Sequence, residues 1–380
     1  MARLGEICSF QSGGTPSRKN PEFYNGSIPW ITTVALNGEM IDESNAVDMI
    51  SEKAIKNSTA KIVPPHSIMV GTRVGIGKVA INSVPMSTSQ DVVSLVGIDE
   101  SAWDKEYLIK FLQGKSAYLI SQSRGATIKG IKIEILADME LPQHALPTQR
   151  RIATTLNKVS EGIALCKQMM VDLDDLVKSQ FVEMFGDPVK NTRNLPTDTL
   201  ANLGELNRGV SKSRPRNLPE LLGGPYPLVQ TGEVSNCDLY INHYESTYSK
   251  LGLAQSKMWP KGTLCITIAA NIAQTGILDF DACFPDSVVG FINGDRVTQI
   301  FIHYWFSFFQ KILDEQAPQV AQKNINLQIL RDLSVVVPLL EEQKAFDEFV
   351  KQAYKSKLAV QQQLAELETL KKSLMQEYFG

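Results

Sequence analysis

Two stretches of the chain carry apolar side chains at alternating steps of four and three residues. The first runs from Arg150 to Phe185, and the second, from Lys344 to Phe379, lies 194 positions later. This seven-residue period is typical of a helix that lies along another helix. The predicted seam consists of Ile152, Leu156, Val159, Ile163, Cys166, Met170, Leu173, Val177, Phe346, Val350, Ala353, Val360, Leu364, Leu367, Leu374 and Tyr378. Lys357 and Lys371 interrupt it, with Leu358 and Leu370 beside them. Because neither helix can bury its seam alone, we expect the two to pair with each other.

The segments that precede the two stretches also repeat. LGEI at 4–7 returns as LGEL at 203–206, IPWITT at 28–33 as YPLVQT at 226–231, and QDVVSL at 90–95 as DSVVGF at 286–291. A repeat of this length predicts two copies of one unit, each a globular region followed by a long helix. The predicted fold is α+β, with two mixed α/β globular regions joined by two long helices. The predicted divisions are 1–146 and 187–340 for the globular regions and 147–186 and 341–380 for the helices.

Local patterns predict the elements of each globular region. A buried strand is expected over Ile28–Leu36, and two strands around a glycine-rich turn are expected within 61–82. Helices are expected over Trp103–Tyr118 and Thr298–Leu313. A short strand is expected in GIKIEILAD (130–138) and in its repeat, NINLQILRD (324–332).

Composition narrows the functional classes. The net charge is −3. Residues 1–149 contain 14 basic (Lys and Arg) and 15 acidic (Asp and Glu) residues, and residues 187–340 contain 13 basic and 14 acidic residues. Nucleic-acid-binding domains are often basic, so any DNA contact here needs a local basic face on a balanced body. No apolar run reaches the length of a membrane span, and the start of the chain lacks a secretory pattern. The five cysteines form no CxxC pair and the four histidines are dispersed, which predicts a cytoplasmic protein without a metal site.

No catalytic motif is present in the sequence. GTRVGIGKVA (71–80) has the wrong spacing for a phosphate-binding loop and predicts a hairpin turn instead. G-x-S-x-G, HExxH, a dinucleotide-binding GxGxxG and the Asn/Asp-Pro-Pro-Tyr element of amino-methyltransferases are absent. We therefore expect no catalytic residue in this chain.

Polar and cationic loop positions are the candidates for DNA contact. The loop 14–19 of the first copy corresponds to 211–216 of the second, and 124–130 corresponds to 319–324. Amide and cationic side chains suit base edges and phosphates. The candidate residues are Thr15, Ser17, Arg18, Lys19, Thr33, Arg73, Lys78, Ser89, Gln90, Arg124, Lys129, Lys212, Ser213, Arg214, Arg216, Gln230, Thr231, Asn271, Gln274, Gln319, Gln322 and Lys323. The large aromatic residues Trp30, Phe301, Tyr304, Trp305 and Phe306 are expected in the core.

These residues carry a resemblance to a known family. SGGTPSRKNPEFYNGSIPWIT, GTRVGIGKVAI, GATIKGI and VPLLEEQKAFDEFV, together with the tandem repeat, resemble the specificity (S) subunit of type I restriction–modification systems. The family's helix start, Pro-Leu-x-Glu-Gln, is similar to Pro338, Leu339, Glu342 and Gln343, which have one additional residue between the leucine and the glutamate. The first copy departs from it, with Leu146-Pro147-Thr148-Gln149.

The resemblance implies a non-catalytic subunit of a restriction and adenine-methyltransferase complex that defends against phage. Each globular region would be a target recognition domain that reads one half of a bipartite DNA target. The two long helices would pack antiparallel as a coiled coil and set the spacing. Two methyltransferase (M) subunits would dock beside the helices, and motor–nuclease (R) subunits would join that assembly. S-adenosylmethionine, ATP and Mg²⁺ would belong to those partners, leaving no cofactor in this chain.

Two other classes remain open from the residues alone. The balanced charge is compatible with a coiled-coil scaffold whose globular heads bind proteins. A nuclease or methyltransferase would be recognised by cutting or methylation of DNA without partners.

Overall fold

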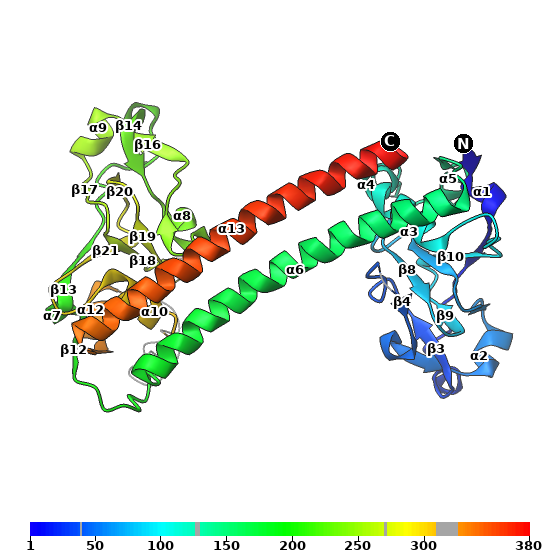
Figure 1. Ribbon diagram of the computed structural model, residues 1–380, viewed down its shortest axis with the longest axis horizontal. Helices are drawn as coiled ribbons and strands as arrows, with labels where there is room; N and C mark the ends of the chain where they lie inside the picture. Colours follow the sequence, from blue (N-terminus) through cyan, green and yellow to red (C-terminus); the bar gives the residue numbers. More distant parts are fainter. Residues whose placement is uncertain (39, 126–129, 270–271, 309–325) are drawn as a thin grey trace. The chain divides into compact units, whose positions relative to one another are not determined.

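The computed structural model describes residues 1–380 except 39, 126–129, 270–271 and 309–325. The chain divides into two compact units, Met1–Leu165 with Gln363–Gly380, and Cys166–Gln362. Two long helices, α6 (Leu146–Phe185) and α13 (Leu340–Phe379), each contribute to both units (Figure 1). The helices thus begin within one residue of their expected positions, although neither forms a segment separate from the globular regions. The α+β class and the tandem repeat are confirmed.

The globular region of the first unit, called head 1 (residues 1–145), contains short strands and helices. Its strands are β1 (Ala2–Arg3), β2 (Ser9–Ser12), β3 (Ile28–Ile31), β4 (Met40–Ile41), β5 (Asp48–Ile50), β6 (Ile62–Val63), β7 (Ile68–Gly71), β8 (Val79–Asn82), β9 (Met86–Thr88), β10 (Val92–Val96) and β11 (Glu140–Leu141). Its helices are α1 (Leu4–Ile7), α2 (Glu52–Asn57), α3 (Lys105–Gly114), α4 (Ser116–Ser121), α5 (Ile133–Ala137) and the 3₁₀ turns η1 (Pro21–Tyr24) and η2 (Glu43–Asn45).

The globular region of the second unit, called head 2 (residues 187–339), follows the same order. Its strands are β12 (Thr197–Thr199), β13 (Gly204–Arg208), β14 (Leu222–Leu228), β15 (Tyr240–Ile241), β16 (Ser246–Tyr248), β17 (Met258–Trp259), β18 (Leu264–Thr267), β19 (Thr275–Leu278), β20 (Ala282–Cys283), β21 (Val288–Asn293) and β22 (Ser334–Val336). Its helices are α7 (Leu200–Leu203), η3 (Pro219–Leu221), α8 (Thr231–Asn236), α9 (Lys250–Ala254), α10 (Gln299–Phe306) and α12 (Leu327–Asp332).

The sheets of the two heads have the same strand order. A five-stranded sheet is ordered β2-β10-β7-β8-β4 in head 1 and β13-β21-β18-β19-β15 in head 2. A four-stranded sheet is ordered β5-β3-β9-β6 and β16-β14-β20-β17, and a two-stranded ribbon pairs β1 with β11 and β12 with β22. The order of strands therefore shows the internal repeat independently of sequence identity.

Several local expectations are confirmed. The glycine-rich turn at 72–78 joins β7 to β8, which pair antiparallel as in a hairpin. The helix expected over Trp103–Tyr118 is present as α3 and α4. The helix expected over Thr298–Leu313 begins as α10, and its residues 309–313 lie outside the described residues.

Three local expectations were wrong. The strand expected over Ile28–Leu36 ends at Ile31, and a turn follows it. The apolar segments in 130–138 and 324–332 form the helices α5 and α12 instead of strands. LGEL at 203–206 is not the structural counterpart of LGEI at 4–7, since Gly204–Leu206 belong to strand β13. The structural counterpart of Leu4 is Leu200, the first residue of α7. The amides of these two residues donate to the carbonyls of Met139 and Leu333, each at 2.9 Å.

The paired helices bury the predicted seam within each unit. In the first unit, Ile152 and Leu156 near the start of α6 share a core with Phe379 at the end of α13. Gly162 allows α13 to approach closely, since a Cβ there would lie 3.2 Å from Leu367 Cδ1. In the second unit the order is reversed, with Val177 near the end of α6 and Val350 near the start of α13 in one core. The two helices are therefore antiparallel in both units.

The remaining seam positions differ in burial. Val159, Cys166, Phe346 and Val360 are also buried. The half-buried positions are Ile163, Met170, Leu173, Ala353, Leu364, Leu367, Leu374 and Tyr378. Leu358 and Leu370 are 42% and 45% exposed. Lys357 does not interrupt the seam as expected but lies within it, since only 7% of the residue is exposed.

The Lys357 ammonium is balanced by two carboxylates of the same unit. It lies 2.5 Å from Asp174 Oδ1 on α6 and 2.6 Å from Asp238 Oδ1 in head 2. Burial alone would lower the pKa of this lysine, but the two carboxylates raise it. The ammonium therefore ties α13 both to α6 and to head 2.

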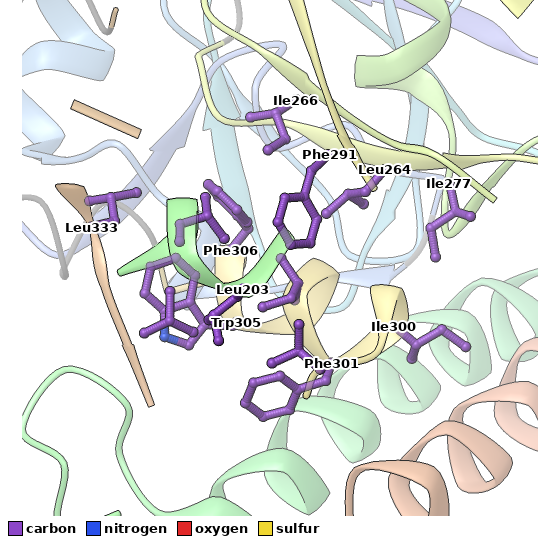
Figure 2. Close-up of a cluster of buried hydrophobic side chains, with 14 of the residues drawn as sticks. Leu203, Leu264, Ile266, Ile277, Phe291, Ile300, Phe301, Trp305, Phe306 and Leu333 are labelled. Atoms are coloured by element: carbon purple, nitrogen blue, oxygen red, sulfur yellow. The ribbon is translucent and has the colours of Figure 1, made fainter. Parts of the chain in front are cut away.

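The core of head 2 is rich in aromatic rings. Figure 2 shows Phe301, Trp305 and Phe306 of α10 in the same cluster as Phe291 of β21. The Phe181 ring of α6 stacks on Phe301 with centroids 5.4 Å apart. Trp30, Phe301, Trp305 and Phe306 are buried as expected, and Tyr304 is half-buried. This cluster fixes α10 against the long helices.

A fully buried glutamine connects the start of α6 to head 1. Gln149 Oε1 accepts from the amide of Asp104, the residue that caps α3, at 2.9 Å. Gln149 Nε2 donates to the carbonyls of Ala102 at 2.9 Å and His144 at 2.8 Å. The oxygen and both N–H groups of the side-chain amide are therefore satisfied inside the protein, as a buried amide requires.

The second copy repeats this arrangement at the start of α13. Gln343 Oε1 accepts from the amide of Thr298, the cap of α10, at 3.0 Å. Its Nε2 donates to the carbonyls of Arg296 and Pro338, both at 3.0 Å. All four positions lie 194 residues after their counterparts. Despite its different residues, Leu146–Gln149 thus begins its helix as Pro338–Gln343 does, and we call the two contacts the glutamine latches.

Candidate nucleic-acid interface

Four connections of head 1 meet at one end of its strands. The amide of Gly14, in the loop after β2, donates to the carbonyl of Thr88 at 2.9 Å. The amide of Ser89 donates to the carbonyl of Ile31 at 2.8 Å, and the amide of Thr72 to the carbonyl of Asp91 at 2.8 Å. These bonds bring together the segments 13–20, 32–36, 72–78 and 89–91, which hold most of the candidate residues of this head. We call this arrangement the loop cluster.

The same four connections meet in head 2. The amide of Val210 donates to Phe284 O at 3.1 Å, that of Val229 to Cys283 O at 2.8 Å, and that of Ile268 to Ser287 O at 3.0 Å. By this correspondence Val210 matches Gly14, so the loop alignment proposed from the sequence, with Ser211 against Gly14, is shifted by one residue. Each head therefore presents the same loop cluster with different side chains.

Three cationic side chains of head 1 line one groove. Arg73, Arg124 and Lys132 border a hollow of about 590 Å³. The backbone around it is closed by two bonds between Arg124 and Gly130, both 3.0 Å, and by the Ile131 amide on Thr72 O at 2.8 Å. No acidic side chain lines the groove among the residues that the structure describes. Arginines without a nearby carboxylate are available to an external anion such as a phosphate.

The loop 14–19 is braced from within. The Trp30 Nε1 donates to Gly14 O at 3.0 Å, and the Tyr24 hydroxyl donates to Pro16 O at 2.6 Å. Arg18 stacks on Tyr24 with 4.3 Å from its guanidinium carbon to the ring centroid and forms an ion pair with Asp48 at 2.5 Å. The hydrogen bond to Asp48 raises the pKa of Arg18. Arg18 is thus partly neutralised, while Thr15, Ser17 and Lys19 stay exposed.

In head 2, Asp286 holds the two candidate arginines. Arg214 lies 3.2 Å from Asp286 Oδ2, and Arg216 contacts the other carboxylate oxygen. Gln255 Oε1 accepts from the amides of Lys212 and Ser213 at 2.6 Å and 3.0 Å. One carboxylate therefore orients two guanidinium groups and cancels part of their charge.

Arg216 also borders a groove with two other candidates, Gln230 and Thr231, and with Ser287, which was not a candidate. The groove is a hollow of about 280 Å³. A guanidinium, an amide and hydroxyl groups together can donate to and accept from base edges. The structure thus brings together residues that are distant in the sequence.

The other candidates are placed individually. Lys78 and Gln90 are exposed in head 1. Thr33 and Ser89 are only 5% and 3% exposed, which leaves little of either side chain accessible to DNA. Gln274 is exposed but borders a different hollow, beside Asp174 and Lys178 of α6. Lys129, Asn271, Gln319, Gln322 and Lys323 lie outside the described residues.

Several interacting residues were not among the sequence candidates. Lys132 completes the groove of head 1, Asp48 and Asp286 pair with arginines, and Gln255 holds a loop. Asp286 is the repeat counterpart of the candidate Gln90, so the repeat itself is a sequence signal for Asp286. The sequence contains no comparable signal for Asp48 or Gln255.

Metal binding and thiol chemistry concern the His, Cys, Asp and Glu side chains of the described residues. Among them, no group of three or more His, Cys, Asp or Glu side chains could hold a metal ion. Burial raises the pKa of the Cys8 and Cys237 thiols to about 12, which disfavours the reactive thiolate. No helix in the described ranges has the length and apolarity needed to cross a membrane.

Comparison with known proteins decides the family. The family model described as "Type I restriction modification DNA specificity domain" matches residues 1–172 and again 199–369. The chain belongs to this family. The two matches follow the two copies of the repeat, so each copy is one specificity domain.

A curated member of this family is similar to this chain in sequence. The type I restriction enzyme MjaIX specificity subunit of Methanocaldococcus jannaschii is 31% identical over 203 residues, which cover 53% of this chain and 47% of the relative. The chain thus spans about half the length of this curated specificity subunit.

Solved structures share the fold. The S subunit of a type I restriction–modification system from M. genitalium has a TM-score of 0.61 at 13% identity and covers 100% of this chain and 95% of its own. A chain from a study of complex assembly and conformational transition in a type I system has a TM-score of 0.63 at 17% identity, with 100% and 96% covered. The whole chain therefore has the same fold as these two solved structures.

Proposed function

We propose that this chain is a non-catalytic subunit that selects the DNA sequence for a type I restriction–modification complex. The observation that carries the proposal is the repeated loop cluster within two matched specificity domains. Each cluster stands on the same framework yet has its own polar residues. Two related but different surfaces suit a bipartite target whose halves differ.

Each head would contact DNA through a local basic face on an otherwise balanced body. In head 1 the groove of Arg73, Arg124 and Lys132 would bind phosphates, with Gln90 exposed in the same loop cluster for base contact. In head 2 the groove of Arg216 and Gln230 would serve the same purpose. Phosphate contacts would position the heads, and the amide and guanidinium groups would read bases.

The long helices would space the heads and dock two M subunits. Apolar side chains remain exposed on α6, among them Leu165, Val171 and Leu176 at 62%, 53% and 49%. Exposed apolar positions of this kind along a helix are typical of an interaction surface. R subunits would join through the M subunits, and S-adenosylmethionine, ATP and Mg²⁺ would be bound by these partners in the cytoplasm.

The runner-up function is a scaffold whose heads bind proteins. The net charge of −3 is the observation in its favour. The groove of head 1, whose described lining residues include three cations and no acidic side chain, favours DNA instead, because several cations in one hollow suit the closely spaced phosphates of a duplex.

A binding experiment tests the proposal. The complete complex with M subunits would be titrated with duplex DNA as wild type and as the Arg73→Gln/Arg124→Gln double variant. If both arginines contact phosphates, the slope of log affinity against log salt should fall by about 0.9 per contact. Lys53→Gln is the control, since Lys53 is an exposed lysine of α2 paired with Glu22. Unchanged affinity and slope in the double variant would refute DNA binding by this groove.

A further inference from the structure

A polar hollow lies in the first unit, away from the loop cluster already described. It has a volume of about 920 Å³ and is bordered by α3, α6 and α13. Lys110 and Glu106 belong to α3, Glu161 to α6 and Lys371 to α13. Neither the fold nor the proposed DNA contacts account for these charges.

Lys110 is a largely buried lysine whose ammonium borders the hollow. The residue is 7% exposed, yet its ammonium has no hydrogen bond and no carboxylate within 4.0 Å among the described residues. The neighbouring Lys115, in contrast, donates to Phe379 O at 2.6 Å. Buried charges are ordinarily paired, because removal of an ammonium from water is costly.

A second ammonium approaches the same space. Burial lowers the pKa of Lys110, and the positive charge of Lys371 lowers it further. The negative charges of Glu106 and Glu161 act in the opposite direction. Two lysines on different helices therefore repel each other across the hollow, and the two glutamates are too distant to form an ion pair with Lys110. An anion between the two ammonium groups would relieve both the repulsion and the desolvation.

The other copy of the repeat shows that the fold does not require a lysine here. The counterpart of Lys110, 194 residues later, is Tyr304 on α10. Its ring packs edge-on against Phe346, with centroids 5.5 Å apart. This framework position borders a hollow in both heads, but it holds an aromatic residue in head 2 and a cation in head 1.

We propose that the hollow of the first unit binds an oxyanion, a phosphate or carboxylate group, between Lys110 and Lys371. Gln113 of α3 and Asn157 of α6 also border the hollow, and their amide groups can donate hydrogen bonds to such an anion. The site does not depend on the DNA-reading function, because no loop-cluster candidate lines it. Free phosphate and a carboxylate of a partner protein are the two sources of such an anion, and the test distinguishes them.

Isothermal titration calorimetry on the full-length chain tests the site. Inorganic phosphate and glutarate would be titrated separately, with chloride keeping the ionic strength constant. Wild-type protein should bind at least one of the two saturably, and Lys110→Met should weaken that binding at least ~10-fold, the effect of losing one charge-assisted contact. Preferential binding of phosphate would indicate a phosphate site, and preferential binding of glutarate a partner carboxylate.

Two further variants make the result decisive. Lys371→Met, at a half-buried position, should weaken binding in the same way and serves if Lys110→Met does not fold. Lys56→Met is the matched control, because Lys56 is an exposed lysine of α2 and should leave anion binding unchanged. Equal binding by wild type and both hollow variants, or no saturable binding of either anion by wild type, would overturn the proposal.

Discussion

The glutamine latches predict a specific loss of stability in each head. Gln343→Met keeps the approximate volume but removes three hydrogen bonds at a position with 0% exposure. A buried hydrogen bond contributes roughly 0.5–1.5 kcal/mol net, so the variant should lose about 3 kcal/mol of local stability. The same substitution at Gln149 should cost a similar amount in head 1, because its contacts are the same.

The assay must resolve the two units, because a chain with two compact units need not unfold in one step. Hydrogen exchange followed by mass spectrometry does so peptide by peptide. In Gln343→Met, protection should fall for the peptide that contains the Thr298 amide and remain for the peptide that contains Asp104. In Gln149→Met the pattern should reverse.

Gln352→Met provides the matched control. Gln352 is an exposed glutamine of α13, so its replacement should change stability by less than about 0.5 kcal/mol. Unchanged protection at Thr298 in Gln343→Met, or a loss no larger than in the control, would refute the reasoning that the amide holds the head to its helix.

Three further predictions concern charged groups. Asp286→Asn removes the carboxylate that pairs with Arg214 and Arg216 and should tighten non-specific DNA binding. The slope of log affinity against log salt should become steeper by at most about 0.9, and weaker binding in a gel shift would contradict this. Lys357→Met leaves two half-exposed carboxylates that water can reach, so urea denaturation should show a loss of about 1–2 kcal/mol in the second unit, and no loss would contradict the seam contact. Burial raises the pKa of Asp347 to about 6 from its ordinary 3.8, so between these values the folded state binds more protons and stability falls as pH rises. Asp347→Asn should therefore match wild type near pH 4 and gain on the order of 1 kcal/mol by pH 7, after allowance for partial solvent screening; a constant difference across this range would contradict it.

The helices and the repeat could be predicted because both are periodic patterns. At Leu156 and Val350, for example, the seven-residue period alone indicates burial, and both side chains are buried. Lys357 shows the limit of the pattern, since its burial depends on Asp174 and Asp238, which lie far from it in the sequence. An apolar period cannot indicate a buried charge whose partners come from other elements.

The contact surface could be predicted only in part. Loop residues such as Arg73 and Arg124 were selected for their chemistry, but their position in one groove follows from strand order and backbone bonds. Arg18 and Arg216 were also selected, whereas their neutralisation by Asp48 and Asp286 depends on contacts between distant segments. The type of a side chain can thus be read from the sequence, while its availability depends on the fold.

The central claim is that each head reads one half of a bipartite target. Its most direct test replaces residues 1–145 with the same region of a relative and maps methylated positions in DNA from cells that carry the complete system. We expect one half of the target to change, while the other half and the gap remain. A change in both halves, or in neither, would contradict the assignment of one half-site to each head.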